Sequence, residues 1–272
     1  MTTSPARAPL VDTHCHLQIL DERGLLQVGL ESAADAGVEQ IVCVGLNLDD
    51  SEVCRTIACG HPGVFFTVGW HPHEPAPPDA VQQRHLAELL AHPRAVAVGE
   101  IGLDLFFRTG YHETPVEVQR TSMGIMLDLA RDARKPVVIH DRDAHEETLD
   151  MVHRWPEVAG VMHCFSGDAA HGARCRERGF LLSFSGIVTF PGSEDIQSAA
   201  RAVDQDGYVV ETDAPFLAPV PHRGRPNVPG YVADTARVLA SLRDDSETAV
   251  RARTTENARR LFGLNASDRL GA

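Results

Sequence analysis

Two histidines near the N-terminus, His14 and His16, are separated by one residue at the end of an apolar segment. Because alternate side chains of a β-strand point to the same side, both imidazoles are expected to project together from one rigid element. Two adjacent imidazoles are good ligands for a divalent cation. In a chain with 14 histidines, however, an isolated His-x-His pair is more often a coincidence than a metal site. The metal hypothesis therefore depends on whether further donors recur at matching structural positions.

Short apolar segments rich in β-forming residues alternate with longer amphipathic segments along the chain. The expected strands are residues 10–16, 40–45, 65–71, 95–104, 136–140, 160–167, 181–186 and 208–213. The expected helices are residues 24–36, 50–59, 80–91, 114–133, 143–153, 169–178, 193–203, 231–242 and 246–262. Continuous apolar strands separated by helices are typical of a parallel sheet that is buried on both faces. The pattern predicts the α/β class and a single (β/α)8 TIM barrel, with a doubly wound open sheet as the competing architecture.

The chain reads as one domain. We expect residues 10–264 to form the barrel, with short tails at 1–9 and 265–272, because no linker, repeat or low-complexity segment interrupts the pattern. Residues 1–9 lack the apolar segment of a signal peptide, and no apolar run is long enough to span a bilayer. The six cysteines contain no Cys-x-x-Cys pair, which favours reduced thiols. These features predict a cytoplasmic protein without membrane contact, and we expect a monomer.

The formal net charge of −13 argues against broad electrostatic binding to nucleic acid or to an anionic membrane. It does not exclude a phosphate-containing substrate that is held locally by metal ions and a few arginines. Lys135 is the only lysine, so nearly all positive charge is arginine. Arginine is the better bidentate phosphate ligand, but a general compositional bias explains the imbalance at least as well.

Polar side chains with catalytic potential recur at the carboxyl ends of the expected strands. They are His16, His71, Glu100, Asp104, His140, His163 and Asp213. In a TIM barrel these ends converge on one face, where active sites are built. Chance placement would scatter such residues over both ends of the strands and over the helices. The convergence therefore favours the barrel over the open sheet and predicts one site at that face.

The candidate ligands comprise four imidazoles and two carboxylates: His14, His16, Glu100, His140, His163 and Asp213. This set exceeds the three protein ligands typical of one catalytic zinc and suits two cations that share a carboxylate. Glu100 is the plausible bridge and Asp213 a ligand that also accepts a proton from water, so both are candidate catalytic residues. A carboxylated lysine could also bridge two ions, but the only lysine, Lys135, precedes its strand and is therefore expected at the opposite end of the barrel from the ligands. Either Glu100 is the bridge or there is only one metal ion. The set implies hydrolysis as the reaction class and leaves zinc, magnesium and manganese open as the ions.

Seven motifs together resemble the TatD family of the amidohydrolase superfamily, with the closest likeness to its YcfH-like branch. They are Asp-Thr-His-Cys-His (12–16), Gly-Glu-Ile-Gly-Leu-Asp (99–104), Val-Ile-His-Asp-Arg-Asp-Ala (138–144), His-Cys-Phe-Ser-Gly (163–167), Ser-Phe-Ser-Gly-Ile-Val-Thr-Phe (183–190), the segment 211–225 and Glu-Asn-Ala-Arg-Arg-Leu-Phe (256–262). The resemblance implies a TIM barrel and a metal-dependent deoxyribonuclease that digests DNA ends, commonly from the 3′ end of single strands.

The resemblance also implies how the two ions are divided. His14 and His16 would hold one ion and His140 and His163 the other, with Glu100 between them and Asp213 as ligand and proton acceptor. One departure concerns Leu105, Phe106 and Phe107, which follow Asp104 where the family often has tyrosines. We therefore expect the phenolic contact to be lost.

Four residues are predicted to contact the substrate. Arg223 and Arg225, on the loop after the last strand, would grip a phosphate, although a solvated loop is the alternative. His71 and His73 would line the entrance or donate to a phosphate oxygen, with a structural role in their loop about equally favoured.

Further expectations concern the surroundings of the site. Trp70, Phe106 and Phe107 are candidates for stacking on a base, with core packing favoured for two of the three. Asp12 is expected to orient an imidazole. The histidines without an obvious partner are interpreted as surface residues: His61, His85, His92, His112, His145, His153 and His171.

The ligand set alone does not choose the bond that is cleaved. A runner-up function is hydrolysis of a carboxylic ester or amide, including removal of a D-amino acid from tRNA. A third hypothesis, a catalytically inactive binding barrel, predicts at least one missing ligand, and all six are present.

Overall fold

The computed structural model describes residues 8–107 and 110–271 and forms one eight-stranded parallel sheet in the order β1 to β8. The strands are β1 (Leu10–Cys15), β2 (Val38–Cys43), β3 (Val64–Val68), β4 (Ala95–Asp104), β5 (Val137–Arg142), β6 (Gly160–Met162), β7 (Phe180–Phe184) and β8 (Tyr208–Val210). Every neighbouring pair from β1 to β8 is parallel. The predicted (β/α)8 TIM barrel is confirmed.

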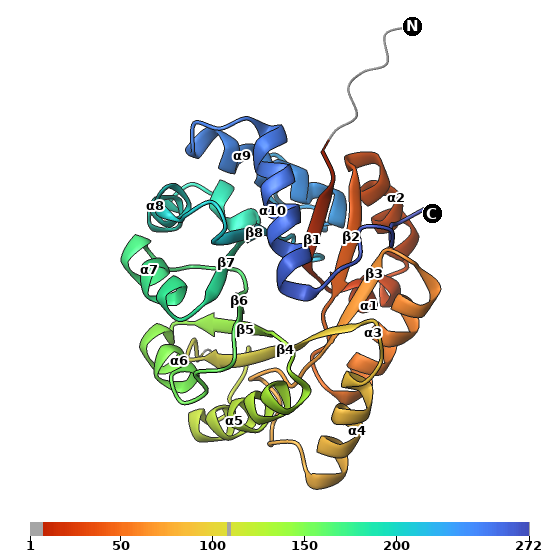
Figure 1. Ribbon diagram of the computed structural model, residues 1–272, viewed down its shortest axis with the longest axis vertical. Helices are drawn as coiled ribbons and strands as arrows, with labels where there is room; N and C mark the ends of the chain where they lie inside the picture. The colour runs from red at the N-terminus through yellow and green to blue at the C-terminus, as the bar shows by residue number, and fades with distance from the viewer. Residues whose placement is uncertain (1–7, 108–109, 272) are drawn as a thin grey trace, which may run out of the picture.

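Residues just beyond β8 close the barrel onto β1. The amide of Asp213 donates to the carbonyl of His14 at 2.9 Å, and the amide of His16 donates to the carbonyl of Ala214 at 2.8 Å. Cys15 and Ala214 form an isolated parallel bridge between the same segments. Figure 1 shows the strands gathered at the centre with the helices around them. Closure brings the first and last predicted ligands side by side, although some 200 residues separate them.

The helices follow the strands in turn. They are α1 (Leu17–Glu22), α2 (Leu26–Ala36), α3 (Leu48–Gly60), α4 (Ala80–Leu90), α5 (Val116–Ala133), α6 (His145–Val152), α7 (Ala169–Glu177), α8 (Glu194–Ala202), α9 (Val232–Leu242) and α10 (Glu247–Phe262), with 3-10 turns η1 (Gly186–Thr189) and η2 (Pro229–Tyr231). Side chains cap several starts, for example Asn47 before α3 and Asp168 before α7. None of these helices is long and apolar enough to cross a membrane.

The predicted boundaries differ from the structure mainly at the carboxyl ends of strands. β6 ends at Met162 and β8 at Val210, several residues earlier than expected. Cys164 (φ 44°) and Asp213 (φ 59°) adopt left-handed backbone conformations, which extended strands do not contain. The apolar pattern continues beyond the strands because the segments that carry the site are also buried. The helix expected at residues 24–36 is present as α2, and a short helix that was not expected, α1, precedes it.

The interior of the barrel is filled by branched apolar side chains and is closed at one end by α10. Val11, Val138 and Val209 belong to a cluster that also includes Ala258 and Phe262 of α10. α10 is fastened to the amino-terminal end of β1, where Thr255 donates to the carbonyl of Pro9 at 2.8 Å. The interior is therefore a packed core rather than a pore, and only the carboxyl-terminal end remains for a site. We call that end the mouth.

The cysteines agree with the expectation of reduced thiols. All six are free; Cys15, Cys43, Cys54 and Cys175 are buried, Cys164 is half-buried and Cys59 is exposed. Cys15 packs in the outer core between the barrel and its helices, away from His14 and His16.

Candidate metal centre

The six predicted ligands meet at the mouth; we call His14, His16, Glu100, His140, His163 and Asp213 the mouth cluster. His14 lies in β1, Glu100 in β4 and His140 in β5, while the other three follow β1, β6 and β8 closely. The pairing of β4 with β5 shifts between Val98 and Ile101, and Glu100 lies within that irregularity. All six side chains are buried or nearly so. Sequence segments far apart in the chain thus supply one compact set of nitrogen and oxygen donors.

One half of the cluster is built on β1. Nε2 of His14 lies 3.2 Å from Nε2 of His16, and Nε2 of His16 lies 3.3 Å from Oδ1 of Asp213. Nε2 of His14 also lies 3.7 Å from Oδ1 of Asp213. Ligand atoms that share one ion at about 2.0–2.2 Å are about 3.3 Å apart in tetrahedral geometry. The three donors have the spacing of a shared cation.

The carboxylate of Glu100 faces two groups of histidines with its two oxygens. Oε2 lies 3.4 Å from Nε2 of His14. Oε1 lies 2.7 Å from Nδ1 of His140 and 3.6 Å from Nε2 of His163. His71 is also close, with Nε2 at 3.6 Å from the same Oε1. A carboxylate with one oxygen toward each group has the geometry of a bridge between two ions.

The charges of the cluster favour cations. Burial raises the pKa of Glu100, but the imidazoles of His163, His71, His14 and His140 outweigh it and hold the pKa well below its usual value. For Asp213, burial is likewise outweighed by the hydrogen bond from His16 and the charge of His163, so its pKa is also lowered. Both carboxylates are therefore ionised at neutral pH.

Two imidazoles show the same preference for positive charge. Burial lowers the pKa of His140, but hydrogen bonds with Asp104 and Glu100 outweigh it and raise the pKa to about 10. The pKa of His163 is raised to about 9, because Glu211 and Glu100 outweigh the effect of burial. The buried carboxylates thus stabilise positive charge in the cluster. Four imidazoles and two ionised carboxylates fit a pair of divalent ions.

Asp104 joins the cluster to the loop after β4. Its Oδ2 lies 3.2 Å from Nε2 of His140 and 2.9 Å from Nε2 of His73. The phenol of Tyr111 donates to the same Oδ2 at 3.4 Å and accepts from Nη1 of Arg142 at 2.8 Å. The expectation that the phenolic contact is lost was wrong, because Tyr111 supplies the phenol from a position seven residues after Asp104.

Glu211 is a partner of the cluster that was not predicted from the sequence. Its Oε1 lies 2.8 Å from Nδ1 of His163 and accepts from the amide of Cys164 at 2.9 Å. Its Oε2 accepts from the hydroxyl of Ser183 at 2.5 Å. The sequence does contain a signal for this role: Glu211 lies two positions before Asp213, as His14 lies two positions before His16. Residues spaced in this way in an extended segment face the same side.

Asp12 does not orient an imidazole, contrary to expectation. Its Oδ1 accepts from the amide of Thr212 at 2.9 Å, and its Oδ2 accepts from the hydroxyl of the same residue at 2.6 Å. Asp12 thus joins β1 to the segment after β8. Asp12 makes these contacts because it lies where β1 meets the segment after β8, and its buried carboxylate faces the hydrogen-bond donors of that segment.

Three of the histidines interpreted as surface residues are not surface residues. His112 is buried, with Nε2 at 3.4 Å from Oδ1 of Asp104. His171 is buried beside Asp141, and His145 is half-buried against the same carboxylate. The interpretation failed because their partner carboxylates lie on other elements, 4 to 30 residues away along the chain.

The residues predicted to contact substrate are divided between the cluster and its rim. His71 and His73 lie against Glu100 and Asp104, inside the site rather than at its entrance. Arg223 and Arg225 are exposed on the loop after β8, and the guanidinium of Arg223 lies 3.9 Å from the ring centroid of Phe190. Arg142, at the end of β5, is a further rim residue that was not predicted from the motifs; its guanidinium lies 4.0 Å from the ring centroid of Phe106.

The aromatic residues predicted to stack on a base differ in their exposure. Trp70 is buried, and its indole nitrogen donates to the carbonyl of Ala76 at 2.9 Å, so it is a core residue. Phe107 is exposed. Phe216, which was not among the predicted aromatic residues, is 43% exposed and lies edge-on to the ring of His16, with centroids 5.9 Å apart.

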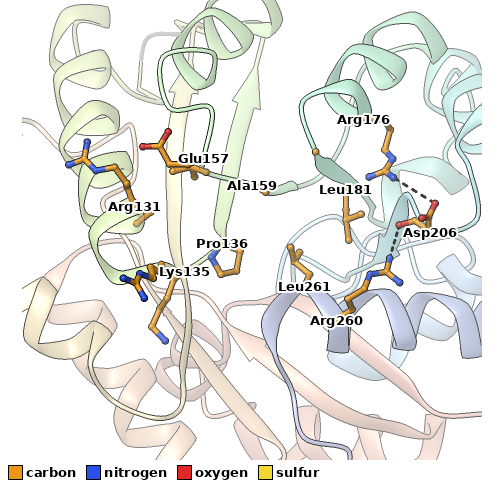
Figure 2. A pocket seen from close by; sticks show the side chains of 14 residues that line it. Arg131, Lys135, Pro136, Glu157, Ala159, Arg176, Leu181, Asp206, Arg260 and Leu261 are labelled. Carbon is orange, nitrogen blue, oxygen red and sulfur yellow. Dashed lines mark hydrogen bonds and ion pairs between the residues drawn. The ribbon is translucent and has the colours of Figure 1, made fainter.

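A cavity of about 790 Å³ lies at the opposite end of the barrel from the mouth. It is lined by residues that precede β5, β6 and β7, including Lys135, Pro136 and Ala159 (Figure 2). The amine of Lys135 donates to the carbonyl of Ala95 at 2.6 Å, at the start of β4. Lys135 is therefore at the wrong end of the barrel to bridge metals, as expected.

The family described as TatD related DNase matches residues 11–263 of this chain. The chain belongs to the TatD family. It is 38% identical over 263 residues to the uncharacterized metal-dependent hydrolase YcfH of Escherichia coli K12, covering 95% of this chain and 97% of that protein. It is 30% identical over 237 residues to the 3′-5′ ssDNA/RNA exonuclease TatD of Escherichia fergusonii, covering 85% and 90%.

A solved structure supports the same assignment. The crystal structure of YJJV, a TatD homolog from Escherichia coli K12, superimposes with a TM-score of 0.88 at 26% identity and covers 95% of this chain and 99% of that one. This chain is accordingly a metal-dependent hydrolase of the TatD family, and the donors that the mouth offers suit that activity.

Proposed function

We propose that this protein is a two-metal-ion exonuclease that removes nucleotides from the 3′ end of single-stranded DNA. The observation that carries the proposal is the carboxylate of Glu100, whose two oxygens face two separate groups of histidines. The relative named as a 3′-5′ ssDNA/RNA exonuclease supports the choice of substrate. The partner is thus a DNA end or an oligonucleotide.

The residues divide into two ligand sets around Glu100. His14, His16 and Asp213 would hold one ion, and His140 and His163 the other. Zinc, magnesium and manganese are all compatible with imidazole and carboxylate donors. When bound, such a pair would activate a water molecule and neutralise the charge that builds up on the attacked phosphate.

Asp213 is assigned a second role, to take the proton of the attacking water. Its lowered pKa keeps it ionised, and 12% of its side chain is exposed, so water reaches it. The backbone of Asp213 is in the left-handed region (φ 59°). The hydrogen bond from its amide to the carbonyl of His14 in β1 holds this conformation. Its orientation is therefore set by the closure of the barrel.

The rim offers contacts for a phosphate and a base. Arg142 lies at the end of β5, two residues after His140, and its guanidinium is held by Phe106 and Tyr111. A guanidinium held in this way suits bidentate binding of a phosphate. The exposed ring of Phe216, beside His16, is suited to stacking on a base. Arg223 and Arg225 would add phosphate contacts farther out.

The test uses single-stranded DNA labelled at the 5′ end and protein loaded with zinc, magnesium or manganese. The proposal expects a ladder of shortening labelled products, and no ladder when phosphorothioate linkages block the 3′ end. Asp213→Asn should abolish the ladder, while Asp195→Asn, an exposed change on α8, should leave it intact.

A D-aminoacyl-tRNA incubated in parallel tests the runner-up reaction. Deacylation of that substrate without any cleavage of DNA would overturn the proposal in favour of an ester hydrolase.

A further inference from the structure

A second group of metal-binding side chains lies on the outer side of β5, separate from the mouth cluster. It consists of Asp141 of β5, His145 at the start of α6, and His171 and Cys175 of α7. We propose that these four residues form a structural zinc site that fastens β5 to α6 and α7.

Three of the distances between donor atoms are close to those of a tetrahedral site, and the donor atoms of Asp141, His145 and His171 all lie within 4.8 Å of one another. Oδ2 of Asp141 lies 2.9 Å from Nδ1 of His145 and 3.5 Å from Nε2 of His171. Sγ of Cys175 lies 3.5 Å from the same Nε2 of His171. Around one zinc ion the expected separations are about 3.3 Å between nitrogen and oxygen and about 3.5 Å between nitrogen and sulfur. Among these three pairs the largest difference from the expected separation is about 0.4 Å, between Asp141 and His145. Cys175 would join the site through the thiol that lies against His171.

The local sequence presents these donors on facing surfaces. His171 and Cys175 are four residues apart on α7, so they share one face of that helix. The carboxylate of Asp168 caps α7 and accepts from the amide of His171 at 2.8 Å, which fixes the first turn. α6 and α7 are neighbours in the outer ring (Figure 1), joined by an ion pair between Arg174 and Glu146.

The chemistry of the donor set favours zinc over harder cations. Two imidazoles, one thiolate and one carboxylate make four ligands, the number in a closed structural zinc site. With the thiol deprotonated, Asp141 and Cys175 carry two negative charges, which balance the ion. Neutrality matters here because the side chain of Asp141 is 5% exposed, that of His171 is 8% exposed and Cys175 is fully buried.

Two buried polar atoms at the site lack a partner among the described residues: Oδ1 of Asp141 and Nδ1 of His171. The hydrogen bonds within the group therefore leave two polar atoms without a partner, and a buried polar atom without a partner lowers the stability of the fold. A cation coordinated by both oxygens of Asp141 and by Nε2 of His171 would supply the partner that Oδ1 lacks. The site would also fix the end of β5, where His140 of the mouth cluster lies.

Cobalt substitution tests the proposal, because a cobalt–thiolate bond has a strong near-ultraviolet charge-transfer absorption. The mouth cluster carries no sulfur, so its loading does not produce this band. The full-length protein loaded with Co²⁺ should show the band, and Cys175→Ser should abolish it. The matched control is Cys59→Ser, which removes the exposed thiol and should leave the band unchanged.

Zinc content provides the second measurement. The His145→Gln, His171→Gln double variant should hold one zinc ion fewer per chain than wild type, with the same circular dichroism. His153→Gln, at the residue that directly follows α6 and lies outside the group, should keep the wild-type content. Absence of the thiolate band from the wild-type protein, or equal zinc content in wild type and the double variant, would overturn the proposal. Because the wild-type spectrum is decisive, the test stands even if a variant fails to fold.

Discussion

Nδ1 of His163 lies 2.8 Å from Oε1 of Glu211, while Nε2 of the same ring faces Oε1 of Glu100 at 3.6 Å. The imidazole is thus held between two carboxylates, one within the mouth cluster and one behind it. A carboxylate on the far nitrogen of a ligating histidine fixes the orientation of the ring and raises its basicity. Glu211 is therefore a positioning residue for the metal centre.

Glu211→Gln should weaken metal binding about 10- to 100-fold, because the amide no longer supports the charge on His163. Titration of the apoprotein with zinc against a competing chelator measures the change. Glu177→Gln, an exposed change on α7, is the matched control. Equal affinity in the variant and wild type would show that Glu211 serves only the fold.

Glu100→Ala should remove the bound metal from the mouth altogether. Two neighbouring dications repel each other strongly in a buried site unless an anion lies between them. The metal content of wild type minus that of the variant, both measured after gel filtration, gives the ions lost from the mouth, because the group around Asp141 is the same in both proteins. Full occupancy in this variant would mean that Glu100 does not bridge.

Phe216→Ala should raise KM for single-stranded DNA about 10-fold or more while kcat changes little. Stacking on one base contributes about 1–3 kcal/mol, and the ring lies beside the cluster rather than within it. Steady-state kinetics on oligonucleotides separates the two constants. Val53→Ala, an exposed apolar change on α3, should alter neither. A large loss in kcat with an unchanged KM would contradict a stacking role.

Two arginines should differ in their effect on catalysis. Arg142→Ala should lower kcat/KM about 10- to 100-fold, because its guanidinium is held against Phe106 and Tyr111 close to Asp104. Arg225→Ala should weaken substrate binding less, since its loop is exposed. Metal content should be unchanged in both variants. A larger loss of kcat/KM in Arg225→Ala than in Arg142→Ala would contradict this, and would mean that the loop after β8 binds the phosphate.

Gly102→Ala should destabilise the barrel by about 2–3 kcal/mol. Its φ of 148° is a conformation that L side chains rarely adopt, and an added Cβ would clash with the backbone carbonyl of His140. Gly192→Ala is the control, since its φ is also positive but the space around it is open. It should cost only about 1–2 kcal/mol. Urea unfolding compares the two, and equal costs would show that the approach to β5 is not tight.

The alternation of strands and helices was readable from the sequence because parallel strands buried on both faces are continuously apolar. The positions of the ligands followed from the same pattern, since His140 and Glu100 lie on strands whose carboxyl ends a barrel must bring together. The strand boundaries were less accurate beyond Met162 and Val210, where buried residues continue past the extended backbone.

The partners around the ligands were largely invisible in the sequence. Tyr111 reaches Asp104 from within a loop, and no periodicity places a loop side chain. Asp141 meets His171 because α7 packs beside α6 and β5, a contact between elements 30 residues apart. Such pairs depend on tertiary packing, so histidines that lack a local partner were misread as exposed.

The most direct test of the two-ion centre is the anomalous scattering of a crystal of the protein loaded with manganese. A two-ion centre bridged by Glu100 would give two peaks at the mouth, about 3.5–4 Å apart, one on each side of the Glu100 carboxylate. A single peak there, or a pair of peaks that Glu100 does not separate, would contradict it.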